Sequence, residues 1–126
     1  MAKRRMISQQ IAESDAFLDL PLTAQALYLH LLLHADDDGF VNNAKTIARM
    51  VGAKAEDLDA LNEKRFILAF EDGVIVVKHW RINNQIRRDR YQVTQYRDHA
   101  ERLFIKANGS YTFDESKGVM AWSPLI

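Results

Sequence analysis

The chain has 126 residues, and its 17 Lys and Arg balance its 17 Asp and Glu, so the formal net charge is zero. This length predicts one domain, and a hydrophobic share of 48% is sufficient for one modest core. The lack of cysteine excludes disulfides and thiolate metal sites, and no apolar run approaches the roughly 18 residues of a membrane-spanning helix. We therefore expect a cytoplasmic protein that does not enter a membrane.

Charge is unevenly distributed along the chain. Residues 1–12 hold three bases and no acid, whereas residues 13–77 hold five bases and twelve acids. Residues 78–106 hold eight bases and three acids, and residues 107–126 hold one base and two acids. An acidic body between basic segments can orient a polyanion such as DNA. Overall neutrality nevertheless tells against a simple DNA-binding module, which tends to be basic throughout.

The first elements are short. Residues 1–5 are predicted to form a mobile basic arm. Met6–Ile11 fits either a strand or an opening turn, and the pattern does not decide between them. Ser14 followed by Asp15 is typical of a cap for a short helical turn through Phe17 and Leu18.

A longer helix is predicted after Pro21, because proline suits the start of a helix. It should end at the turn Asp36–Gly39, and Phe40-Val41 is then expected as a short strand beside a later hairpin. The helix is apolar nearly all round, which is typical of a helix that is central to the core or part of an interface. One apolar face consists of Ala24, Leu27, Tyr28, Leu31, Leu32 and Ala35, and the other of Ala26, Leu29 and Leu33.

Asn42–Ile67 contains the pattern of two helices joined by a tight turn. Ala44, Ile47, Ala48 and Val51 recur at helical spacing after Asn42-Asn43, which offers a cap. Gly52 can end this helix in the left-handed conformation. A second helix should start near Ala53–Glu56 and bury Leu58 and Leu61.

A hairpin is predicted directly after this helix pair. The apolar runs Ile67–Phe70 and Val74–Val77 flank Glu71-Asp72-Gly73, and Asp-Gly between apolar runs is a strong hairpin signal. Two short helices with a glycine turn, followed by a hairpin, are the order of a winged helix-turn-helix. This order favours nucleic-acid binding over catalysis.

The segment after this hairpin is basic. Lys78–Ile82 is expected to be extended or turning, and Asn83-Asn84 can cap a charged helix over Gln85–Leu103. Asn108-Gly109 predicts a second hairpin over Phe104–Phe113, and residues 114–126 are expected to be a loose tail. The predicted fold is therefore α+β and mainly α, with a winged-helix domain over residues 6–82 and a basic helical and hairpin extension over residues 83–126.

The candidate DNA-binding residues lie mostly outside the second helix of the pair. That helix carries four carboxylates, which would repel phosphates, and the hairpin tip Glu71-Asp72 is acidic too. The arginines after the hairpin are interleaved with Asn83, Asn84, Gln85 and Tyr91, which can also reach phosphates or bases. A solvated charged face is the competing interpretation. The candidate set is Lys3, Arg4, Arg5, Lys54, Lys78, Arg81, Arg87, Arg88 and Arg90.

No pattern predicts a metal, a cofactor or catalysis. Asp36–Gly39 resembles the start of a calcium loop, but the required acidic residues are missing at both ends of that motif, where His34 and Lys45 stand. His30 and His34 share a helix face without an evident third ligand. The five glycines are isolated, and no nucleophile elbow, phosphate loop or dinucleotide fingerprint occurs.

Several strings resemble those of phage replisome organiser proteins, whose N-terminal domain is similar to that of DnaD-type primosome proteins. The resemblance covers roughly residues 6–97 and rests on Met6–Leu31, Ala35–Ala53, Gly73–Asn84 and Asp89-Arg90-Tyr91. It implies a winged-helix domain with a role in starting phage or prophage DNA replication. It also implies self-assembly and contacts to origin DNA or to replication-initiation and helicase-loading proteins. Members of the family usually continue into a further C-terminal region.

We therefore expect a non-enzymatic, DNA-associated replication-initiation protein that forms a homo-oligomer. The alternative is an assembly module whose winged helix pairs with itself or a partner and does not touch DNA. The acidic second helix favours this alternative, whereas the basic segment Arg81–Arg90 favours DNA binding. A sequence-specific transcription regulator would need a basic second helix. The all-round apolar helix, Trp80 and Trp122 are the expected association surfaces.

Overall fold

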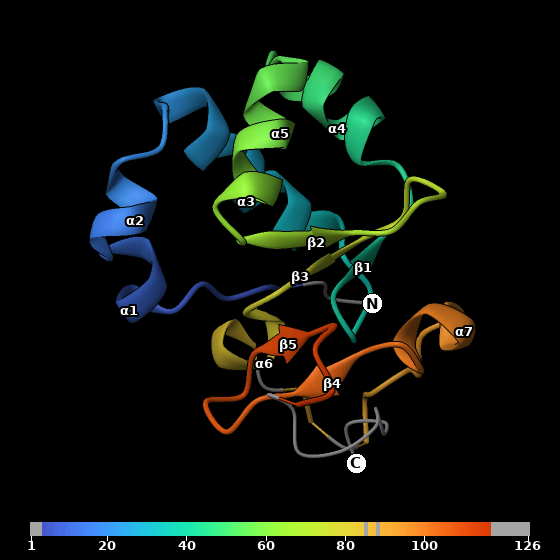
Figure 1. Cartoon of the computed structure of the whole chain (residues 1–126). Coiled ribbons are helices and arrows are strands. Elements are labelled where there is room, and N and C mark those ends of the chain that lie inside the picture. Colours follow the sequence, from blue (N-terminus) through green and yellow to red (C-terminus); the bar gives the residue numbers. More distant parts are fainter. Residues whose placement is uncertain (1–3, 85, 88, 117–126) are drawn as a thin grey trace.

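The computed structural model describes residues 4–84, 86–87 and 89–116. The described chain is a mixed α/β protein in which helix exceeds strand. Helices α3, α4 and α5 lie above a small three-stranded sheet, and a second, two-stranded sheet lies below it with α6 and α7 (Figure 1). Within the described residues, no helix combines the length and the apolar character needed to cross a membrane.

Three helices form the N-terminal part. The short helices α1 (Gln9–Ala12) and α2 (Asp15–Leu18) begin at serine caps, and the Ser14 hydroxyl accepts the Phe17 N–H at 3.2 Å as its sequence predicts. Helix α3 (Leu22–His34) confirms the long helix expected after Pro21. Its buried residues are Ala24, Leu27, Tyr28, Leu31 and Leu32.

The predicted helix pair is confirmed as α4 (Ala44–Val51) and α5 (Ala55–Glu63). Gly52 ends α4 with a positive φ of 79°, which glycine adopts at little cost. Asp57 then fixes the start of α5, because its carboxylate accepts the Lys54 N–H at 2.9 Å and the Thr23 hydroxyl at 2.8 Å. Asp57 is buried. Its bond to Thr23 ties α5 to α3.

The main sheet is antiparallel and has the order β1-β3-β2. Strands β2 (Ile67–Ala69) and β3 (Ile75–Val77) form the predicted hairpin, with Leu68 opposite Val76. Strand β1 (Phe40–Val41) pairs with the other edge of β3, which confirms the short strand expected there. The sheet therefore joins residues on both sides of the helix pair.

The segment after β3 differs from its prediction. Residues expected to be extended or turning form the short helix α6 (Trp80–Asn83), and the helix expected over residues 85–103 is wrong for the described part. Only α7 (Arg97–Ala100) is helical there. The apolar residues of this segment form only a weak helical stripe (Ile86, Val93, Tyr96, Ala100 and Leu103). Hydrogen bonds from Gln92 and Thr94 to distant residues hold the backbone instead. The second hairpin is confirmed as β4 (Phe104–Ile105) and β5 (Tyr111–Thr112).

Several aromatic residues lie within the core. Phe17, Tyr28 and Phe66 meet edge to face at centroid distances of 5.4 to 5.7 Å, an arrangement that adds about 0.5–1.5 kcal/mol per pair beyond burial. Trp80 and Tyr111 are fully buried. The expectation that Trp80 forms an association surface is thus wrong, because the indole lies inside the protein. Trp122 lies outside the described residues.

Candidate nucleic-acid interface

The turn Asp36–Gly39, here called the acidic turn, anchors residues 91–94 of the chain that follows α6. The buried Asp38 carboxylate accepts the Tyr91 hydroxyl at 2.7 Å and the Thr94 N–H at 2.9 Å. Burial raises the pKa of this carboxyl group. Asp36 accepts the N–H groups of Asp38 and Phe40 as well as the Thr94 hydroxyl. The turn was predicted, but its role as an anchor was not.

Further contacts bring other parts of the chain to the same turn. The Asp37 carboxylate accepts the Gln92 N–H at 2.9 Å, and the Asp37 carbonyl accepts the Trp80 indole N–H at 2.8 Å. The Tyr111 hydroxyl donates to the Asp38 carbonyl at 2.9 Å. Three adjacent carboxylates in one turn are an unusual number of acceptors, and this was the available sequence signal for the anchor.

Arg5 does not belong to a free basic arm. Its guanidinium donates to the Asp37 carboxylate at 2.9 Å and to the Ala35 carbonyl at 2.9 Å, and it lies 5.3 Å from the centre of the Trp80 ring. The side chain is only 9% exposed. The predicted arm is therefore wrong at this position, because the acidic turn supplies a partly buried charge partner. Arg4 is exposed, and Lys3 lies outside the described residues.

Asn83 and Asn84 are structural rather than DNA-facing. Their side-chain oxygens accept the N–H groups of Ser8 and Met6, respectively, each at 2.7 Å. The Asn83 amide also donates to the Tyr28 hydroxyl at 2.9 Å. Both asparagines are buried, so the expectation that they cap a helix or reach phosphates or bases is wrong. Gln85 lies outside the described residues.

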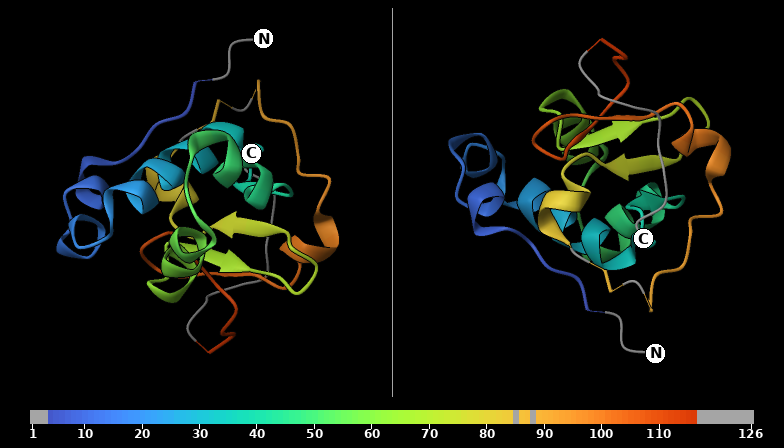
Figure 2. Two further views of the ribbon diagram at one scale, coloured as in Figure 1. Left: turned by 90° about the horizontal axis from the view of Figure 1, so that it is seen from above. Right: turned by 90° about the horizontal axis from the view of Figure 1, so that it is seen from below.

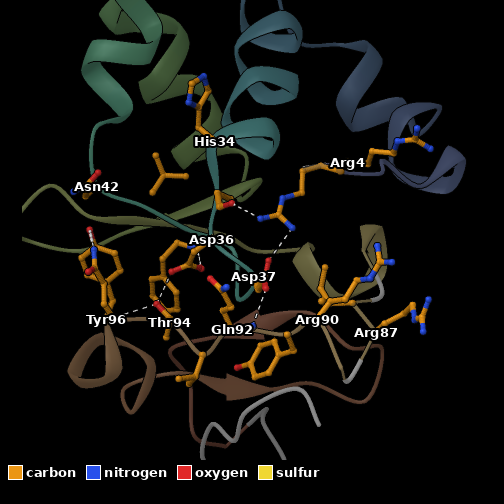
Figure 3. A pocket seen from close by; sticks show the side chains of 18 of the residues that line it. Arg4, His34, Asp36, Asp37, Asn42, Arg87, Arg90, Gln92, Thr94 and Tyr96 are labelled. Atoms are coloured by element: carbon orange, nitrogen blue, oxygen red, sulfur yellow. Dashed lines mark hydrogen bonds and ion pairs between the residues drawn. The ribbon is translucent and has the colours of Figure 1, made fainter. Parts of the chain in front are cut away.

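An open groove lies between the end of α3 and residues 86–87 and 89–96, with a volume of about 1230 Å³. Arg4, Arg87 and Arg90 lie on one flank, and Asn42 and Tyr96 lie on the opposite flank (Figure 3). We call the first set the arginine flank. The floor includes Asp36, Asp37, Gln92 and Thr94 from the anchor described above.

The groove brings together part of the predicted cationic set. Asp37 pairs with Arg5, and Asp89 pairs with Arg87 at 3.1 Å in an exposed contact. An exposed pair of this kind contributes little and opens readily. Among the described residues, Arg4 and Arg90 have no ion-pair partner. The arginine flank can therefore attract an anion.

The other predicted cations lie elsewhere. Lys54 precedes α5, and Lys78 follows β3, and neither lines the groove. Arg81 is half-buried, with its guanidinium 5.8 Å from the centre of the Tyr111 ring. Arg88 lies outside the described residues. Lys54, Lys78 and Arg81 therefore do not line the groove with the arginine flank.

The tip of the β2–β3 hairpin is held by α7 and the residues after it. Arg102 donates to both Glu71 carboxylate oxygens, at 2.7 and 3.2 Å, and Asp72 lies 2.7 Å from the His99 ring nitrogen. These partners lower the pKa of Glu71 and of Asp72. Figure 2 shows α7 beside this tip in both views. Both carboxylates of the tip thus have partners within the protein.

The helix pair presents two different surfaces. On α5, three of the four predicted carboxylates, Glu56, Asp59 and Glu63, are exposed, so its outer face is acidic, whereas Asp57 is buried. On α4, Lys45 and Arg49 are exposed at i, i+4 spacing. Sequence reasoning missed these two bases. The lack of any acid between residues 39 and 55 could have revealed them.

Among the described residues, no cluster of three or more His, Asp or Glu side chains has the arrangement of a metal site. Comparisons of the chain with protein-family models, with curated proteins and with solved structures gave no match.

Proposed function

We propose that this chain is a winged-helix protein that binds DNA non-covalently during the initiation of phage or prophage replication. The element order α3-β1-α4-α5-β2-β3 and the sheet order β1-β3-β2 support the winged-helix assignment. The resemblance of four sequence strings to phage replisome organisers supports the role in replication.

The observation that carries DNA binding is the arginine flank. Arg4, Arg87 and Arg90 come from segments more than 80 residues apart and line one open groove. Guanidinium groups hold phosphates through paired hydrogen bonds and charge. Neutralising phosphates dominates non-specific DNA affinity, so this flank can bind DNA without reading its sequence. The acidic outer face of α5 takes no part in this mechanism.

Charge reversal tests the proposal. Arg87→Glu combined with Arg90→Glu should weaken binding at least about tenfold on duplexes or strands of any sequence, because two phosphate contacts become repulsive. Fluorescence anisotropy at several salt concentrations measures both affinity and salt dependence. Log affinity of the unchanged protein should fall with log salt at a slope of about −2 to −3, and that of the variant less steeply.

A matched control changes Arg49→Glu and Lys64→Glu, which are exposed and lie outside the groove. This variant carries the same charge change and should retain most of the binding. Equal binding by the groove variant and the unchanged protein would remove the arginine flank from the mechanism. Loss in the control alone would move the interface to the helix pair.

Self-assembly is a second candidate function, and the outer face of α3 favours it. Leu22, Leu29 and Leu33 are 81%, 42% and 51% exposed on this helix. Leucines on one helix face are costly in water and are often covered by a partner. Assembly and DNA binding use different surfaces here, so one protein can combine them.

A further inference from the structure

We propose that the groove beside the acidic turn holds single-stranded DNA, with phosphates on the arginine flank and bases toward the tyrosine side. This inference rests on the proposed function and adds the form of DNA that the site accepts. It follows from the size of the groove, the chemistry of its two flanks and the state of the other surfaces.

The size of the groove favours an extended ligand. Its volume of about 1230 Å³ exceeds the roughly 1,000 Å³ that bounds most small-molecule pockets. It is open to solvent, and most of its lining side chains are polar. A short stretch of an extended polymer fits such a site better than an enclosed metabolite does.

The two flanks match the two sides of a single strand. The arginine flank provides cations for phosphates. Opposite it, the Tyr96 ring is supported by Phe40 at 5.9 Å and by His99 at 5.6 Å between ring centroids, so it offers a fixed surface for a base. Tyr91 also lines the groove. Unpaired bases can stack on such rings, whereas bases in a duplex are already stacked on each other.

Amide groups near Tyr96 add hydrogen-bonding capacity. Asn42 and Gln95 are exposed and line the groove. Their amides can donate to and accept from the base edges that pairing would otherwise occupy. An unpaired base would therefore find both a stacking surface and polar partners on this side.

The carboxylates on the groove floor already have partners within the protein. Asp37 is paired with Arg5, and Asp36 accepts three hydrogen bonds from within the protein. Asp37 also accepts the Gln92 N–H, and Asp38 accepts the Thr94 N–H. The part of the groove floor between Tyr91 and Tyr96 is therefore held in place before any ligand arrives. The site is preorganised, which lowers the entropy cost of binding.

The surfaces with which a winged helix would grip a duplex are poorly suited to it in this chain. The outer face of α5 carries three exposed carboxylates, and the acidic hairpin tip is bound by Arg102 and His99. Repulsion of duplex phosphates at α5 leaves the groove as the favoured site.

Anisotropy with two probes tests the inference. The probes are a fluorescein-labelled oligothymidylate of about 20 nucleotides and a mixed-sequence duplex of equal length. The unchanged protein should bind the single strand about tenfold more tightly or better. Tyr96→Ala should weaken single-strand binding about tenfold while Tyr96→Phe, which keeps the ring, retains it.

Photocrosslinking gives a readout on the unmodified protein, which avoids any loss of folding in Tyr96→Ala. A bromodeoxyuridine-substituted strand should form adducts within residues 91–96, located by mass spectrometry. Adducts confined to other peptides would overturn the inference.

The outcomes separate the two proposals. Equal or tighter binding to the duplex, still weakened by Arg87→Glu with Arg90→Glu, would overturn the single-strand site and leave the proposed function in place. Binding of neither probe would overturn both proposals.

Discussion

Gly39 shows how a single residue can hold the acidic turn in place. Its φ is +94°, a value that side chains of L-residues rarely allow. A Cβ built there would lie 2.7 Å from Cγ and 2.8 Å from Cβ of the buried Trp80. The turn must pass this close to the indole because the Asp37 carbonyl accepts its N–H. Glycine is therefore required for both backbone and packing.

We expect Gly39→Ala to lower the free energy of unfolding by about 3 kcal/mol or more, since overpacking adds to backbone strain. Gly73→Ala is a matched control, because Gly73 has a φ of +92° but open space around its Cβ position. It should cost only about 1–2 kcal/mol, the price of the left-handed backbone. Urea denaturation of both variants measures the difference. Equal losses would show that contact with Trp80 does not matter.

At the scale of elements, α3 has two apolar faces, of which one is buried and the other is exposed. One face packs Leu27, Leu31 and Tyr28 into the core. The other leaves Leu22, Leu29 and Leu33 in contact with solvent. Local periodicity correctly predicts a helix that is apolar on both sides, and the packing of the remaining chain selects which side is covered.

We expect Leu29→Lys combined with Leu33→Lys to abolish self-association, because two ammonium groups would have to be desolvated in the interface. Light scattering across a range of concentrations measures the effect. Met50→Lys on α4 is the control, since Met50 is also exposed, at 68%, but lies on another helix. An unchanged protein that remains monomeric at every concentration would exclude this face as an assembly surface.

At the scale of the whole molecule, buried ionisable groups make stability depend on pH. Burial lowers the pKa of His79 to about 4, and the nearby Lys78 and Lys106 contribute in the same direction. The neutral ring is thus favoured in the folded state. Its contribution to stability is complete above the unfolded pKa of about 6.5 and is lost as pH falls toward 4. Protonation of Asp38, whose pKa is raised, opposes this loss.

We expect the unchanged protein to lose on the order of 2 kcal/mol of stability between about pH 6.5 and pH 4 through His79, after allowance for its partial exposure. His79→Gln should show a correspondingly flatter profile over this range. Glu71 and Asp72 have lowered pKa values, so their contributions are lost only at lower pH. Denaturation at a series of pH values tests this, and parallel profiles for the two proteins would contradict it.

The sequence by itself determined the elements whose signals are local. The helix pair with Gly52, the hairpin around Asp72-Gly73 and the second hairpin around Asn108-Gly109 all depend on neighbouring residues. Turn chemistry and hydrophobic period act over a few residues, so a linear pattern is sufficient to predict them. The acidic outer face of α5 follows from helical spacing in the same way.

Only the tertiary structure decided which polar residues meet. The partners of Asp38 are 53 and 56 residues away in Tyr91 and Thr94, and Arg5 lies 32 residues from Asp37. Such pairs leave no periodic mark, and they replaced the helix expected after Asn84. The arginine flank exists for the same reason: Arg4 lines the same groove as Arg87 and Arg90 because the acidic turn binds both Arg5 and Gln92.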